Sequence, residues 1–129
     1  MRRSVAIRLG LATLLAASIA PALGAGVPAL DECDLLVRDR PREPYSYFCY
    51  VLAVRGGRDA DDAARRLEAI LTLHPDLHRA RLYLGWIEEI RESPRSETII
   101  REAMDGMEAA GDHWGMVYGG TGFSFRLGQ

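Results

Sequence analysis

The sequence predicts an all-α protein built of stacked antiparallel helical hairpins, and three observations support this fold class. Apolar residues recur at intervals of three and four along successive short segments, as on one face of an amphipathic helix. Proline, glycine or aspartate separates these segments, as at helix boundaries. Alternating runs of Val, Ile and Thr, which would indicate strands, do not occur in the sequence.

Residues 1–25 have the composition of a signal peptide. Arginines at positions 2, 3 and 8 precede an apolar stretch from Leu9 to about Ala20, which is shorter than the roughly 20 residues that cross a bilayer. Small residues follow, so we expect cleavage within Ala22 to Gly26 and a periplasmic or secreted protein without a membrane partner. The alternative is that the leader is not cleaved and anchors the protein in the membrane.

The first two helices are expected over about Asp31–Arg40 and Pro44–Arg55, divided by prolines and ended by Gly56. In an antiparallel hairpin, Cys33 and Cys49 would lie at similar distances from the turn, which makes a disulfide geometrically reasonable. Thiols of exported proteins also tend to pair. The alternative is two free, buried cysteines.

The third helix is expected to begin at Asp59, because two further aspartates follow where carboxylates suit the positive end of the helix dipole. His74 and Pro75 end it. Asp76 is the expected cap of a fourth helix, which runs to about Glu92.

Ser93 is the expected cap of a fifth helix, with Pro94 in its first turn and Gly111 after its end. Asp112 is expected to cap a sixth helix. Five glycines between positions 115 and 128 weaken that last helix, because each interior glycine costs about 1 kcal/mol relative to alanine.

A period of about 34 residues relates two parts of the chain. In the unit counted from Pro44, an aromatic, a small, a bulky apolar residue and a proline occupy positions 4, 20, 24 and 32: Tyr47, Ala63, Leu67 and Pro75. In the unit counted from His78, Leu84 and Gly85 occupy positions 7 and 8. After one deletion, Ile100 and Ala103 occupy positions 24 and 27.

This pattern resembles the tetratricopeptide repeat, an α-solenoid of helical hairpins. The resemblance covers residues 44–111 as two repeats, after a short helix and linker at 26–43 and before an incomplete third repeat or capping helix at 112–129. Three positions depart from the family pattern: Val51 replaces a glycine, and Arg81 and Glu88 replace aromatic residues. The chain is also loosely similar to the exported regions that precede CHAT peptidase domains in bacterial proteins.

The resemblance implies a concave groove lined by positions 2, 5, 9 and 12 of each unit. These positions are Tyr45, Phe48, Leu52, Arg55, Arg79, Leu82, Trp86 and Glu89. Aromatic residues and arginine are enriched at binding hot spots, so we expect a module that binds a peptide or protein segment. Arg55 and Arg79 would be available to a carboxylate of that segment. The alternatives are the accessory region of a truncated exported enzyme and a structural packing module.

Candidate catalytic and metal-binding patterns are weak, so we expect no enzyme activity, cofactor or metal site. His74 and His78 have the spacing of helical metal ligands, but Pro75 interrupts the helix between them. The glycine-rich run at 119–122 lacks the lysine of a phosphate loop. The glutamates at 88, 89 and 92 are interpreted as a solvated helix face.

Composition excludes two further classes. The 129 residues contain sixteen basic groups, all arginine, and eighteen acidic groups. Without the three arginines of the leader, thirteen basic groups face eighteen acidic ones, a net charge of −5, so we expect no nucleic-acid partner. Hydrophobic residues form 48% of the chain, which is too many for a chain disordered by composition.

Overall fold

A computed structural model describes residues 26–117 of the chain. The expected signal peptide and the part of the sixth helix beyond residue 117 lie outside this range. The described residues form helices and no strand, which confirms the all-α class. None of these helices has the length and apolar character of a membrane span.

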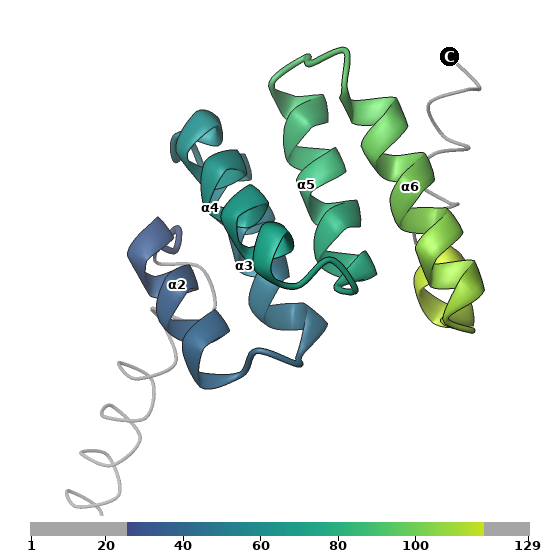
Figure 1. Cartoon of the computed structure of the whole chain (residues 1–129). Coiled ribbons are helices and arrows are strands. Elements are labelled where there is room, and N and C mark those ends of the chain that lie inside the picture. Colours follow the sequence, from purple (N-terminus) through teal and green to yellow (C-terminus); the bar gives the residue numbers. More distant parts are fainter. Residues whose placement is uncertain (1–25, 118–129) are drawn as a thin grey trace, which may run out of the picture.

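Five helices follow one another across the molecule (Figure 1). Their bounds are α2 Leu30–Asp39, α3 Pro44–Arg55, α4 Ala60–Leu73, α5 His78–Ile90 and α6 Ser96–Ala109. Residues 113–117 are also helical. Helix α2 packs against α3, and α5 packs against α3, α4 and α6. The centre of the molecule is therefore α5.

Several helix ends follow the predicted local signals. Pro44 is the first residue of α3. The Asp59 side chain caps α4 by accepting hydrogen bonds from the backbone N–H groups of Asp61 (2.9 Å) and Asp62 (3.2 Å). Gly57 (φ 102°) and Gly111 (φ 71°) adopt the left-handed backbone after α3 and α6, which favours glycine.

The predicted caps of α5 and α6, Asp76 and Ser93, are wrong. Helix α5 begins at His78 after an N-cap at Leu77, with no side-chain cap, because the backbone N–H of His78 already bonds the Asp76 carbonyl in a tight turn. Helix α6 begins at Ser96 rather than beside Pro94. The Ser93 hydroxyl instead accepts a hydrogen bond from the Arg95 N–H (3.3 Å) in the turn before the helix.

Helix α5 also ends two residues earlier than predicted, and its acidic end is not a uniformly solvated face. Glu92 has a left-handed φ of 57°, so the helix cannot continue through it. The Glu88 side chain is only 1% exposed and accepts a hydrogen bond from Arg91 (2.5 Å). Arg91 also pairs with Asp61 near the start of α4 (2.7 Å), which ties the end of α5 to that helix.

The predicted disulfide between Cys33 and Cys49 is confirmed at the level of geometry. The two sulfur atoms lie 2.18 Å apart and the two Cα atoms 5.5 Å apart, and both residues are buried. This pairing is compatible with an oxidising location. Noncovalent contacts reinforce it: the Tyr50 hydroxyl donates to Asp34 (2.5 Å), and Arg66 of α4 pairs with Asp34 (2.6 Å). Helix α2 is thus joined to both α3 and α4.

The core consists of two clusters that meet at α5. The larger one spans α2 to α5 and the start of α6, and the smaller one lies between α5 and α6. A closely packed crossing lies beside the smaller cluster. A Cβ atom added at Gly85 would lie 2.5 Å from Cγ1 of Ile100, so glycine permits the observed approach of α5 and α6.

Removing the disulfide should destabilise the fold. Replacing both Cys33 and Cys49 with serine should lower the free energy of unfolding by about 3 kcal/mol, because the unfolded chain regains the entropy of an open loop. Urea unfolding followed by tryptophan fluorescence measures this loss. The wild-type protein under dithiothreitol is the control and should match the variant, whereas an unchanged midpoint on reduction would contradict the prediction.

The α5–α6 crossing can be tested with a double-mutant cycle. Gly85→Ala should destabilise the wild-type protein by about 1–3 kcal/mol, because the new methyl group meets Ile100. In an Ile100→Ala background the same change should be neutral or stabilising, because the space is open and alanine favours helix. Equal effects of Gly85→Ala in both backgrounds, measured by urea unfolding, would show that the two residues are not coupled.

Candidate functional site

Aromatic rings from α3 and α5 form one continuous cluster, in which Tyr83 is buried. Phe48 lies between the helices, with its ring centroid 5.4 Å from that of Tyr83 and 6.4 Å from that of Trp86. Tyr45, one helical turn before Phe48, extends the surface at 6.3 Å. Residues three apart share a face of a helix, so two pairs of rings meet where α3 and α5 pack together.

A pocket of about 320 Å³ opens beside these rings. Its lining comes from three places in the chain: Pro44, Tyr45 and Phe48 of α3, Arg79 and Tyr83 of α5, and Trp114 of the helical segment 113–117. We call these six residues the aromatic pocket. Tyr45 is 68% exposed and Trp114 is 56% exposed, so two of its rings present much of their surface to solvent.

The ion pair of Arg79 and Asp112 positions Trp114, the residue that segment 113–117 contributes to the aromatic pocket. Arg79 donates from Nε to Oδ2 (2.5 Å) and from Nη2 to Oδ1 (2.7 Å), and its guanidinium lies 4.4 Å from the centre of the Trp114 ring. These hydrogen bonds from Arg79 lower the pKa of Asp112. Asp112 also accepts a hydrogen bond from the Gly115 N–H (3.0 Å), which confirms its predicted role as a helix cap.

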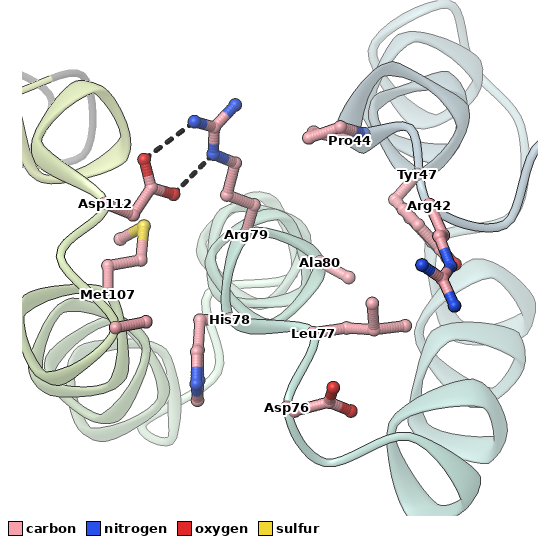
Figure 2. A pocket seen from close by; sticks show the side chains of 11 residues that line it. Arg42, Pro44, Tyr47, Asp76, Leu77, His78, Arg79, Ala80, Met107 and Asp112 are labelled. Carbon is pink, nitrogen blue, oxygen red and sulfur yellow. Dashed lines mark hydrogen bonds and ion pairs between the residues drawn. The ribbon is translucent and has the colours of Figure 1, made fainter.

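A second pocket of about 220 Å³ adjoins the first and shares Pro44 and Arg79 with it (Figure 2). It is more polar. Tyr47 donates its hydroxyl hydrogen to the Pro41 carbonyl, and burial raises the pKa of Tyr47. His78 is directed toward α6, where a Cβ at Gly106 would lie 2.1 Å from its Nδ1.

Three of the eight predicted groove residues, Tyr45, Phe48 and Arg79, lie together in the aromatic pocket. Trp86 is half-buried against Phe48. Leu52 and Arg55 are exposed further along α3, and Glu89 is half-buried near the end of α5.

One expectation about this surface is wrong. Leu82 is 1% exposed and lies in the cluster with Ile100 and Met107, because α6 covers that side of α5. It therefore does not line a groove. Asp112 engages two of the nitrogens of Arg79, so a ligand carboxylate would have to share the guanidinium with it.

Pro44, Tyr83 and Trp114 of the aromatic pocket were not predicted as binding residues. Tyr83 was recognisable in principle, because it follows Arg79 by one helical turn. Trp114 had no comparable signal. Its position depends on how the chain turns after α6 and on the pair of Arg79 and Asp112.

Within residues 26–117, no group of three or more His, Cys, Asp or Glu side chains is arranged to hold a metal ion. No family model, curated protein or solved structure matches the chain. What the site can do therefore follows from its own residues. Exposed rings beside a neutralised arginine offer an apolar contact surface with a few hydrogen-bond donors.

The pair of Arg79 and Asp112 predicts a pH dependence. The pKa of Asp112 in the folded protein lies below the ordinary carboxyl value of 3.8. The charged carboxylate therefore stabilises the fold at pH values above 3.8, and this stabilisation is lost as the pH falls through the lowered pKa. Asp112→Asn keeps a capping side chain but removes the charge, so it should cost about 1–2 kcal/mol at pH 7.

Urea unfolding of the wild-type protein and Asp112→Asn between pH 7 and about pH 2 tests this dependence. The difference in free energy of unfolding should shrink toward zero at the acid end. A difference that stays constant over the whole range would mean that the charge of Asp112 does not stabilise the fold.

Proposed function

We propose that this protein is an exported, tetratricopeptide-like helical module that binds a peptide or protein segment at the aromatic pocket. The proposal rests on one observation: residues from α3, α5 and segment 113–117 together line one open pocket that is rich in aromatic rings. Tyr, Trp and Arg, the residue types that dominate binding hot spots, form four of its six walls.

The repeat interpretation is supported by the burial of the residues that the pattern singles out. Tyr47, Ala63 and Leu67 of the first unit are buried, as are Ala80 and Leu84 of the second. Gly85 lies at a close helix crossing, where the family pattern has its glycine. In such an arrangement α3 and α5 are the first helices of successive hairpins, and the aromatic pocket lies on the face that they share.

The open shape of the site favours a chain-like ligand. The two adjoining pockets share Pro44 and Arg79, so together they extend along the junction of α3 and α5. A peptide that lies across helices can contact several such pockets in succession. The exported location is supported by the disulfide and by the composition of the leader.

Peptide selection tests the proposed function. Phage-displayed random peptides selected on the oxidised protein, then synthesised with a fluorophore, should bind with a Kd that rises at least tenfold, about 1.4 kcal/mol, in Tyr45→Ala. Tyr45 is the appropriate position because its exposed ring can be removed with little effect on the core.

Leu73→Ala is the matched control, since Leu73 is 76% exposed on α4, away from the aromatic pocket. It should leave the Kd unchanged. Unfolding midpoints of both variants establish that they remain folded. If no selected peptide depends on Tyr45, the protein does not bind peptides at this site, and a purely structural packing role is favoured.

A further inference from the structure

We propose that the aromatic pocket recognises proline, presented by an uncharged segment in the extended polyproline II conformation. This inference rests on the proposed function and specifies its ligand. Three properties of the pocket favour proline: its ring-lined walls, its cancelled charge and the kind of hydrogen-bonding groups that it offers.

The walls suit a flat, rigid apolar side chain. Tyr45 and Phe48 meet at 44°, and Phe48 packs at 61° on the buried Tyr83, so the rings form inclined walls rather than one flat stack. A pyrrolidine ring can lie against such walls through its C–H groups. Because proline is already restricted in the unbound peptide, its binding loses less conformational entropy than binding of a flexible side chain.

The charge balance disfavours ionised side chains. Among residues 26–117, Arg79 is the one charged residue in the lining, and Asp112 neutralises it through two hydrogen bonds. An acidic ligand residue would have to compete with Asp112 for the guanidinium. A basic residue would approach Arg79 without a carboxylate left to receive it. An uncharged residue meets neither penalty.

The hydrogen-bonding groups suit a ligand that accepts more than it donates. The arginine and the exposed tyrosine of the lining, Arg79 and Tyr45, can both donate, and none of the lining residues within 26–117 is a carboxylate or an amide. Figure 2 shows the remaining guanidinium nitrogen of Arg79 directed away from Asp112. A polyproline II segment has carbonyl groups without internal partners, and its prolines have no N–H to satisfy.

The test uses fluorescein-labelled hexaproline, blocked at its C-terminus, and matched hexapeptides in which the two central prolines are replaced by leucine, aspartate or lysine. Fluorescence anisotropy with the oxidised full chain should give a Kd for hexaproline at least tenfold lower than for each replacement. Trp114→Ala and Tyr45→Ala should each weaken hexaproline binding at least tenfold, whereas Leu73→Ala should not change it.

Tyr45→Phe separates the hydroxyl donor from the ring. It should weaken hexaproline binding several-fold, less than Tyr45→Ala, because the ring wall remains. If selected peptides depend on Tyr45 but contain no proline, or if the leucine peptide binds as well as hexaproline, the proline inference is wrong and the proposed function stands. If neither selected peptides nor hexaproline depend on Tyr45, both proposals are wrong.

Discussion

The burial of α5 on three sides is the constraint on which the rest of the structure depends. This helix contacts α3, α4 and α6, and it contributes residues to both core clusters. Gly85 allows the approach of α6, while the buried Glu88 is compensated by Arg91, which also reaches α4. A helix so enclosed leaves only a narrow strip of its surface for other contacts.

The part of the α5 surface that these helices leave uncovered determines where the candidate site lies. Arg79, Tyr83 and Trp86 lie along the part of α5 next to Phe48 of α3, so the rings meet at the junction of these helices. Asp112 then draws the segment after α6 back toward Arg79 and places Trp114 as a third wall. The same ion pair that shapes the pocket also removes its net charge, which links the architecture of the site to the chemistry of the ligand it favours.

The opposite end of the molecule is held together by different means. Helix α2 packs against α3, and its hold on the fold includes a buried disulfide, the bond between Tyr50 and Asp34, and the pair of Arg66 and Asp34. In a domain this small, a cross-link can supply stability that the limited core does not. The edge of α3 beside α2 is thereby covered, while the edge nearer Trp114 is partly open.

By itself, the sequence determined the features that depend on neighbouring residues. Pro44 and Gly56 bound α3, Asp59 caps α4, and the hairpin spacing brings Cys33 to Cys49. Tertiary structure decided which side of each helix faces water. Leu82 and Glu88 occupy positions that a repeat pattern or a charge pattern assigns to the surface. Yet α6 covers Leu82, and Glu88 is buried with its charge paired to Arg91. Likewise, the distance in sequence between Arg79 and Asp112 contains no sign of their ion pair, because only the antiparallel packing of α5 and α6 brings the two ends of that hairpin together.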